Sequence, residues 1–342
     1  MHGDRLIRMR RDWLISCVLL LLLAAMFVTS LLAGRIWLPV GEVWDGLRSL
    51  DHGSKDANLA ATIVMQLRLP RAVLALEVGG ALGVAGAVLQ GVTRNPLAEP
   101  GLLGVSAGAA LGAVIAVYFG FATHFTTAAP LLGLIGALLA SFLTFALGRG
   151  GGTITLVLAG AAVSALAAAG IALALNFAPS PYAAYEIMTW LMGSLADRSW
   201  NHVFLVTPFI VLGCAMLLFT ARGVDALTLG EAQARSLGIN IGRLYFLAVF
   251  GTALAIGAST AVTGVVGFIG LIAPHLVRPL LGHQPSRILL PAALSGALLL
   301  LAADIATRLI HIGPELKLGV LTSLIGTPFF FWLVVRLRKT AP

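Results

Sequence analysis

Three arginines and an aspartate near the ends of apolar segments are the residues of this chain best suited to bind a charged partner. Arg68 and Arg71 lie just before an apolar run. An arginine side chain binds a carboxylate through two parallel hydrogen bonds, and at a membrane rim it also anchors in lipid headgroups. Arg308 follows Asp304 by one helical turn, the favourable order for an ion pair. The pattern allows acidic-partner recognition, lipid anchoring or a structural ion pair.

A second motif, residues 94–104 (RNPLAEPGLLG), joins two apolar runs. Asn95 followed by Pro96 is a turn signal. Pro100 suits the first turn of a following helix, and Glu99 suits the positive end of that helix. The motif predicts a tight cytoplasmic hairpin. Its functional alternative is a constriction at the inner mouth of a pathway, and the spacing fits both.

Residues 225–240 form a polar segment with the pattern of a short helix. Thr228 and Glu231 fit a capping box, and Gly238 fits a C-terminal stop. The apolar residues expected to face a contact are Leu229, Ala232 and Leu237. So short a helix is unstable alone, so it packs either on its own membrane helices or on a cytoplasmic subunit.

Glu77 is an ionisable residue inside an apolar run, where a charge is costly and indicates a functional site. The alternative is a position near the outer end, where the carboxylate reaches water or Arg71. No metal site is predicted, because the seven His residues lack ligand spacing. Cys17 and Cys214 fall in apolar runs and indicate no disulfide. His275 is interpreted as a packing or hydrogen-bonding residue.

These residues must be positioned by elements that lie in a membrane. Of 342 residues, 59% are hydrophobic and 11% are charged, and the mean hydropathy is +0.98. A soluble domain is roughly a quarter charged, so lipid is the solvent for most of this chain. The sequence predicts an all-α integral membrane protein with one transmembrane domain over residues 1–342. Ten spans are expected, at residues 13–34, 72–92, 101–120, 128–147, 153–175, 203–221, 244–263, 265–282, 288–310 and 318–336.

The charge distribution predicts the orientation. The net charge is +8, but the basic residues are not clustered with aromatic residues, so nucleic-acid binding is not expected. Arg and Lys are more frequent on the side that carries both termini, which places both termini in the cytoplasm. The first apolar run, Trp13–Gly34, exceeds the roughly 7–15 residues of a signal-peptide core, so we interpret it as a retained helix.

Two extramembrane segments and one proline shape the outer side. Residues 35–71 form the longest outer loop, with polar interfacial character. Pro70 favours an extended conformation before it and a helix start after it. Residues 179–200 are too polar and too short to span. They predict either a half-inserted helix that lines an outer vestibule or an interfacial loop with an aromatic belt.

An ordered set of motifs from about residue 60 onward resembles the permease family of iron–siderophore, haem and vitamin B12 ABC importers. The motifs, in chain order, are RLPR, RNPLAEPGLLGVSAGA, LTLGEAQARSLG, GFIGLIAPHLVR and ELKLGVLTSLIGTPFF. The resemblance implies a vitamin B12 permease-like fold of ten helices that works as a homo- or heterodimer. It also implies two ATPase subunits, which bind ATP and Mg²⁺, and a periplasmic substrate-binding protein. No cofactor is expected in the chain itself.

The resemblance also assigns residues by matching motif positions. Docking of the binding protein would use Arg68, Arg71 and Arg308. The cytoplasmic gate would comprise Asn95, Leu97, Thr153 and Ile154. Coupling to the ATPase would use Thr228, Leu229, Gly230, Glu231, Ala232, Arg235, Leu237 and Gly238. Glu77 departs from the family, which usually has an apolar residue there, and is a possible pathway residue.

The energy for transport must come from another chain. None of the lysines, which are Lys55, Lys317 and Lys339, lies in a GxxxxGK[ST] phosphate-binding loop. The sequence predicts a non-enzymatic permease subunit that passes a ferric siderophore or related iron chelate across the bacterial inner membrane by alternating access. Haem and vitamin B12 are alternative substrates. An ion-coupled secondary carrier, with Glu77 or Asp304 as ion sites, is an alternative of a different class.

Overall fold

The protein is all-helical over the residues that the computed structural model describes, which are 2–34, 36–48, 59–125, 127–310 and 316–340. The predicted fold class is thereby confirmed. Eight helical runs in these ranges are long and apolar enough to cross a membrane. They comprise α1 (His2–Leu32), the run of α3 (Leu59–Thr62), η2 (Ile63–Arg68) and α4 (Leu69–Thr93), α7 (Ala128–Gly148), α8 (Gly152–Asn176), α10 (Trp200–Leu218), α13 (Ile241–Thr263), α15 (Pro285–Leu309) and α16 (Leu318–Thr340).

Two shorter apolar helices, α5 (Val105–Tyr118) and α14 (Ile269–Leu281), occupy the third and eighth predicted spans. At about 1.5 Å per residue, each is shorter than the roughly 30 Å hydrocarbon core of a bilayer. All ten predicted spans are therefore helical, although these two are too short to cross a bilayer alone. The remaining elements are α2 (Val40–Arg48), η3 (Pro100–Leu103), α6 (Phe121–His124), α9 (Pro181–Leu191), α11 (Ala221–Leu227) and α12 (Glu231–Ser236).

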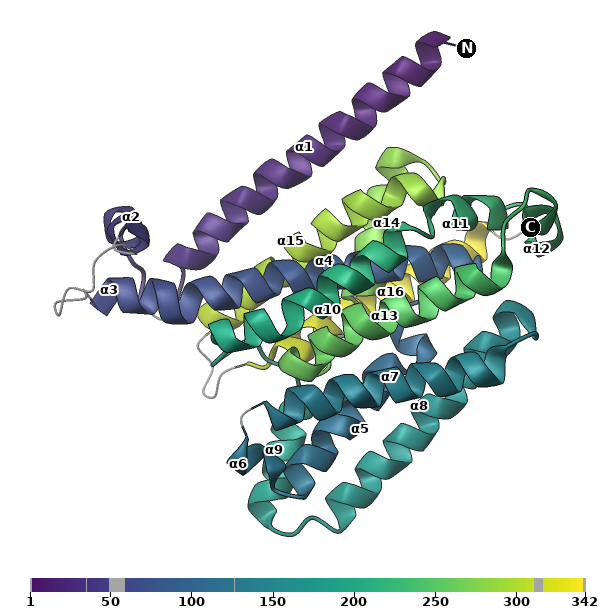
Figure 1. Cartoon of the computed structure of the whole chain (residues 1–342). Coiled ribbons are helices and arrows are strands. Elements are labelled where there is room, and N and C mark those ends of the chain that lie inside the picture. The colour runs from purple at the N-terminus through teal and green to yellow at the C-terminus, as the bar shows by residue number, and fades with distance from the viewer. Residues whose placement is uncertain (1, 35, 49–58, 126, 311–315, 341–342) are drawn as a thin grey trace.

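The helices form two groups that meet at α13 (Figure 1). One group contains α4, α10 and α13 to α16, and the other contains α5 and α7 to α9. Helix α13 packs against α4 and α10 on one side and against α5 and α7 on the other. Helix α1 lies against α15 and diverges from the group towards its own beginning. Helix α1 begins on the side of the molecule that carries α11 and α12. Helix α16 finishes on the same side.

Helix α4 is the centre of its group because glycines let it approach its neighbours closely. A Cβ atom on Gly79 or Gly83 would collide with the backbone of α15 at Gly296 or Ala292. A Cβ atom on Gly86 would likewise collide with the backbone of α14. In lipid, apolar burial does not drive two helices together, so close packing of small residues supplies much of the attraction.

A continuous helix occupies the end of the predicted outer loop. Residues 35 and 49–58 of that loop lie outside the described residues. The helix begins at Leu59 and passes Pro70 without a break, through the π-helical turn η2. The predicted extended segment before Pro70 and the predicted helix start after Pro70 are therefore both wrong.

The π-helical turn explains how the helix accommodates its proline. In this turn the N–H of Leu69 bonds to the carbonyl of Val64, five residues back. With the same spacing, the carbonyl of Met65 would accept a hydrogen bond from residue 70. That residue is Pro70, which has no N–H to donate. The indole Nε1 of Trp200, on α10, donates to the Met65 carbonyl instead, at 2.8 Å. A side chain from another helix thus replaces the missing donor.

Trp200→Phe is expected to lower the free energy of unfolding by about 1 kcal/mol, because it leaves the Met65 carbonyl without its donor while keeping an aromatic ring. Thermal unfolding in detergent would measure the change. Phe204→Leu is the control, because it removes the ring that stacks on Trp200, with centroids 5.7 Å apart, and keeps the hydrogen bond. If Trp200→Phe proves as stable as the wild type, the indole bond is not needed to support the turn.

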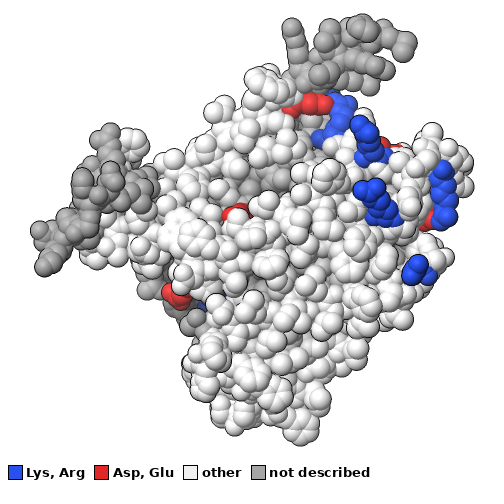
Figure 2. Space-filling view, viewed as in Figure 1, with Lys and Arg blue, Asp and Glu red and all other residues white. Residues whose placement is uncertain are grey.

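Basic side chains gather at one end of the face shown in Figure 2, the end that carries α11 and α12. One of the ion pairs of the structure joins α15 to α1. Arg287 Nε donates to Asp12 Oδ2 at 2.6 Å. The predicted orientation would place this basic end in the cytoplasm, and it stays a prediction.

Candidate functional site

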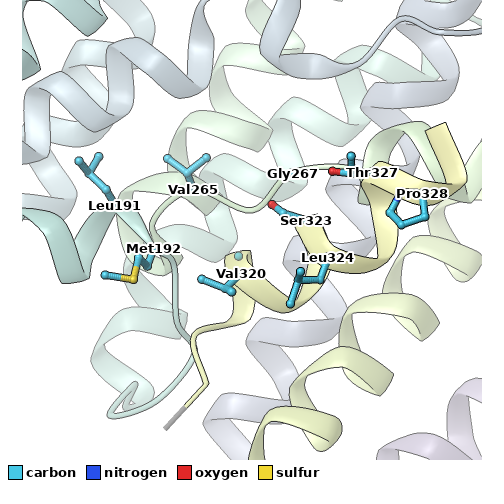
Figure 3. Close-up of a pocket in the computed structure, with 10 residues that line it drawn as sticks. Leu191, Met192, Val265, Gly267, Val320, Ser323, Leu324, Thr327 and Pro328 are labelled. Carbon is cyan, nitrogen blue, oxygen red and sulfur yellow. The ribbon is translucent and has the colours of Figure 1, made fainter. Parts of the chain in front are cut away.

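A cavity of about 650 Å³ opens where the ends of several helices meet (Figure 3). Its walls are the end of α9, the link between α13 and α14, and the first turns of α16. The lining residues are Leu191, Met192, Val265, Gly267, Gly319, Val320, Ser323, Leu324, Thr327 and Pro328. Apolar side chains with a few hydroxyl groups suit a bulky ligand of modest polarity.

Backbone hydrogen bonds join the end of α9 and the residues after it to the end of α13 and the start of α16. The N–H groups of Leu318 and Gly319 donate to the carbonyls of Gly193 and Met192, each at 3.0 Å. The N–H of Ser194 donates to the last residue of α13 at 2.7 Å. Irregular backbone at membrane depth is tolerated only where it is buried in protein or lines a cavity.

The segment 179–200 contains helix α9 and is not a simple loop. Ser180 caps this helix, because its hydroxyl accepts a hydrogen bond from the N–H of Ala183 at 3.1 Å. Pro181 occupies the first helical position, where its missing N–H costs nothing. The helix ends at Leu191, in the wall of the cavity. The segment therefore contains a short helix whose end lines the cavity, and its half-insertion at an outer vestibule stays a prediction.

Arg68 and Arg308 come together at the end of α1. Arg68 donates to the carbonyls of Leu31, Leu32 and Ile36, at 2.6–2.7 Å. Arg308 donates to the carbonyls of Ser30 and Ala33 and to the Ser30 hydroxyl, at 2.5–3.1 Å. The last carbonyls of a helix lack intrahelical partners and carry a partial negative charge. The two guanidinium groups therefore cap α1.

Asp304 connects the remaining arginine to this cluster. The fully buried carboxylate accepts hydrogen bonds from Arg71 Nε and from Arg308 Nη2, both at 2.8 Å. The predicted ion pair between Asp304 and Arg308 is confirmed. The sequence did not predict that Arg71, on α4, shares the same carboxylate. Charged groups on two helices thus meet at one buried acceptor.

The structure gives the predicted docking residues a structural role. Arg68 is 8% exposed, and the side chains of Arg71 and Arg308 are 13% and 8% exposed. All three bond within the chain, where they fix the end of α1 to α4 and α15. Their docking of a binding protein stays a prediction.

Glu77 lies at the contact between α4 and α10. Its carboxylate accepts a hydrogen bond from Thr207 Oγ1, with distances of 2.9 and 3.0 Å to its two oxygens. The Glu77 side chain is half-buried. Thr207 is thus its partner in the structure, and Arg71 is engaged by Asp304 instead. A role of Glu77 in the pathway stays a prediction.

Glu77→Gln is expected to lower uptake while the amount of assembled protein stays constant. The amide keeps an oxygen that can accept from Thr207, and it removes only the charge. Thr207→Val is the matched control, because it keeps the charge and removes the donor, at a cost of about 1 kcal/mol in stability. Uptake into vesicles and size-exclusion profiles would be measured together. Unchanged uptake in Glu77→Gln would dismiss a pathway role.

The predicted gate residues come from two cytoplasmic-type segments. Asn95 Oδ1 accepts from the N–H of Leu97 at 2.9 Å, and Arg94 takes a left-handed conformation with φ 50°. The turn predicted at Asn95 and Pro96 is therefore confirmed, but α4 and α5 that flank residues 94–104 pack in different groups and do not form the predicted tight hairpin. Thr153 and Ile154 lie in the first turn of α8, where Ile154 is 76% exposed. The gating role of all four stays a prediction.

The polar segment 225–240 contains α11 and α12 in place of one capped helix. The predicted capping box is wrong, because Thr228 Oγ1 donates to the Asp225 carbonyl at 2.6 Å at the end of α11. Gly230 takes the N-cap position of α12 with φ 104°, a conformation that a threonine rarely adopts. The predicted C-terminal stop is confirmed, since Gly238 has φ 84° and follows α12 in a Schellman arrangement.

The apolar residues of this segment do not pack on the chain's own membrane helices. Leu229 and Leu237 are 61% and 63% exposed, and Ala232 is exposed too. Ala234 is the residue of α12 that is buried. Helix α12 thus packs on its own chain through Ala234 and exposes its leucines, and the surface for another subunit stays a prediction. We call Leu229, Ala232 and Leu237 the α12 apolar surface.

A hydrogen-bonded triangle ties α12 to two other elements. Tyr245 OH, on α13, lies 2.6 Å from Glu231 Oε1 and 2.8 Å from Thr153 Oγ1. Thr153 Oγ1 lies 3.4 Å from Glu231 Oε1. The hydrogen bond from the Tyr245 hydroxyl contributes most to lowering the pKa of the Glu231 carboxyl, so the carboxyl stays ionised. The predicted coupling helix therefore contacts a predicted gate residue directly.

Sequence reasoning missed the partners rather than the motifs. Trp200, Thr207, Tyr245 and Asp304 each bond a residue that is distant in the chain. Each is a polar group at or within an apolar span. Such groups need a partner in lipid, so their positions were a usable signal for interhelical contacts.

Long apolar helices around a cavity, together with an exposed short helix at one end, are the architecture of a multi-pass membrane protein. The chain matches the FecCD transport family over residues 21–336, and it belongs to this family. It is therefore a permease subunit of a bacterial ABC importer and resides in the inner membrane.

Two relatives and one solved structure agree with this assignment. The hemin transport system permease of Yersinia pestis is 40% identical over 282 residues, 81% of this chain and 84% of that protein. The vitamin B12 import system permease of Klebsiella pneumoniae is 37% identical over 333 residues, 97% and 96% of the two chains. An inward-facing structure of a metal-chelate type ABC transporter has a TM-score of 0.80 and 31% identity, and covers 95% of this chain and 99% of its own.

Proposed function

We propose that this permease passes a ferric siderophore or related iron chelate from a periplasmic binding protein into the cytoplasm. The cavity at the helix ends carries the proposal. It is large, and it is mostly apolar, with Ser323 and Thr327 as hydroxyl-bearing residues. A chelated metal presents an organic shell that suits such a lining. The similarity to a metal-chelate transporter supports this class, and the similarity to hemin and vitamin B12 permeases keeps those two substrates as alternatives.

Two ATPase subunits would drive the transport from the cytoplasmic side. The α12 apolar surface is the feature that supports this part of the proposal, because it is exposed and has no partner among the described residues. A second copy of this chain, or a related permease, would complete the pathway. Both termini would be cytoplasmic, which places the basic end seen in Figure 2 beside the ATPase.

The binding protein would dock at the opposite end, near Arg68, Arg71 and Arg308. Arginine side chains recognise carboxylates through paired hydrogen bonds, and this cluster contains three of them. Acidic side chains of the binding protein would complement it. The charge reversals Arg68→Glu and Arg71→Glu should weaken docking.

A secondary carrier has less support. Asp304 is fully buried and accepts from two arginines, which leaves it unsuited to bind a coupling ion. Purification of the tagged chain from its native membrane tests both readings. Recovery of a P-loop ATPase supports the importer, and uptake of a ferric siderophore by vesicles that contain the complex and its binding protein supports the substrate. Uptake without any ATPase would favour the carrier. If only haem or vitamin B12 competes for uptake, that compound replaces the ferric siderophore as the proposed substrate.

Tyr245→Phe is expected to uncouple ATP hydrolysis from uptake, because it removes the hydroxyl that joins Glu231 to Thr153 and keeps the ring. The number of ATP molecules hydrolysed per substrate imported should rise at least about threefold, as expected for the loss of roughly 1 kcal/mol of coupling. Tyr182→Phe is the control, because that tyrosine is exposed and lies on α9. An unchanged ratio in Tyr245→Phe would show that the triangle does not transmit motion.

A further inference from the structure

A small basic cavity lies beside the segment that leads into α12. Its volume is about 270 Å³, and it forms between the end of α4, the end of α14 and the start of α15. Three groups in its lining are basic, which are Arg94, Arg278 and His283. Thr228, at the end of α11, contributes to the same wall.

Arg278 is a half-buried charge without a carboxylate partner among the described residues. Its guanidinium donates to Gln90 Oε1 at 2.6 Å, and Gln90 is itself buried. Gln90 in turn directs its amide group to the carbonyl of Leu271. A neutral amide positions the guanidinium and leaves its charge uncompensated. A charge that is partly removed from water is costly unless an anion pairs with it.

The nearby carboxylate on α11, that of Asp225, already has hydrogen-bond partners. Asp225 accepts from the backbone N–H and the hydroxyl of Ser286, at 2.8 and 2.6 Å, and from Gln284 Nε2 at 2.8 Å. It therefore caps the start of α15. The cavity thus combines three basic groups with a local acid that serves elsewhere, so it has the charge of an anion site.

We propose that this cavity receives an acidic side chain of the ATPase subunit, next to the α12 apolar surface. The proposal rests on the proposed function and adds a second, ionic contact to it. Position favours a protein carboxylate over a lipid headgroup. Helix α4 is the largely buried centre of its group, so neighbouring helices separate most of it from the surrounding lipid. The cavity also adjoins Thr228, which leads directly into α12.

The test measures the affinity between the detergent-purified permease and the ATPase subunit that copurifies with it, over a range of NaCl concentrations. An ionic contact makes the affinity fall as salt rises. Arg94→Asn with Arg278→Gln is expected to raise the Kd at least about tenfold at low salt and to flatten the salt dependence. Asn suits the left-handed backbone at position 94. Leu229→Ser is the matched control, and it should raise the Kd while the salt dependence persists.

Folding is controlled separately, since Arg278 has a structural bond to Gln90. Arg94→Asn alone changes an exposed side chain and should still flatten part of the salt dependence. The charge reversal Arg94→Glu should weaken binding of the ATPase. One acidic-to-arginine change on the ATPase should restore the affinity, which identifies the partner group. A wild-type salt dependence in the double variant would overturn the inference and leave the proposed function standing.

Two further outcomes separate the alternatives. If the double variant loses a tightly bound anionic phospholipid, measured by native mass spectrometry, and keeps its affinity for the ATPase, the cavity is a headgroup site and the inference fails. If the wild-type permease binds no ATPase at any salt concentration, the proposed function fails and the inference falls with it.

Discussion

Asp304→Asn is expected to lower the free energy of unfolding by about 3–5 kcal/mol, the largest stability effect that we expect from a single substitution in this chain. The substitution keeps the shape of the side chain and removes the buried charge that pairs with both Arg71 and Arg308. Both side chains are largely buried, so neither can recover full hydration. The arginines would also hold the end of α1 less firmly, because Arg308 caps that helix.

The two half-buried free cysteines, Cys17 and Cys214, allow the measurement. A thiol-reactive dye reports their exposure during thermal unfolding in detergent. Asp12→Asn is the matched control, because the same change removes the partner of Arg287 in a pair whose side chains are 25% and 24% exposed. Its expected cost is at most about 1 kcal/mol. Equal costs for the two variants would mean that Asp304 is not the acceptor on which the arginine cluster depends.

The pair of substitutions Leu229→Asp and Leu237→Asp is expected to abolish uptake, with a loss of at least about a hundredfold. Both side chains are exposed, so the permease itself should fold normally. In an assembly they would be buried against the ATPase, where apolar anchors near the centre of an interface contribute about 2 kcal/mol or more each. A buried unpaired carboxylate would add a further cost.

The matched control replaces both leucines with methionine, which conserves volume and apolar character. This variant should retain most of the uptake. Copurification of the ATPase, its hydrolysis rate and vesicle uptake should be measured for both variants. If the aspartate variant transports at the wild-type rate, the α12 apolar surface is not the contact that drives the cycle.

The helices were predictable because lipid demands long apolar runs. Each of the ten predicted spans corresponds to a helix at the same place along the chain. The errors arose where one side chain overrides a local preference. Pro70 predicted a break, but the indole of Trp200 replaces its missing donor and the helix continues. That contact joins α3–α4 to α10, so no local pattern could reveal it.

The candidate sites divide in the same way. The exposed leucines at 229 and 237 and the glycine stop at 238 follow from local helix geometry, and the structure shows them. Thr228 was assigned as a cap because its spacing to Glu231 fits. That carboxylate bonds Tyr245 instead, since a partly buried hydroxyl on α13 is within reach. Choices between a local and a distant partner depend on the packed bundle, which a single sequence does not contain.

The cavity is framed by bonds between main-chain groups of three segments, and those bonds do not depend on which side chains are present. Side chains that point into it can therefore change without dismantling the frame. A gene duplicated from this one could acquire a new substrate through a few replacements at positions such as 320, 324 and 327. The scaffold would make substrate range quick to evolve while its architecture stays fixed. The same property makes these positions the natural starting point for redirecting the importer towards an unfamiliar substrate.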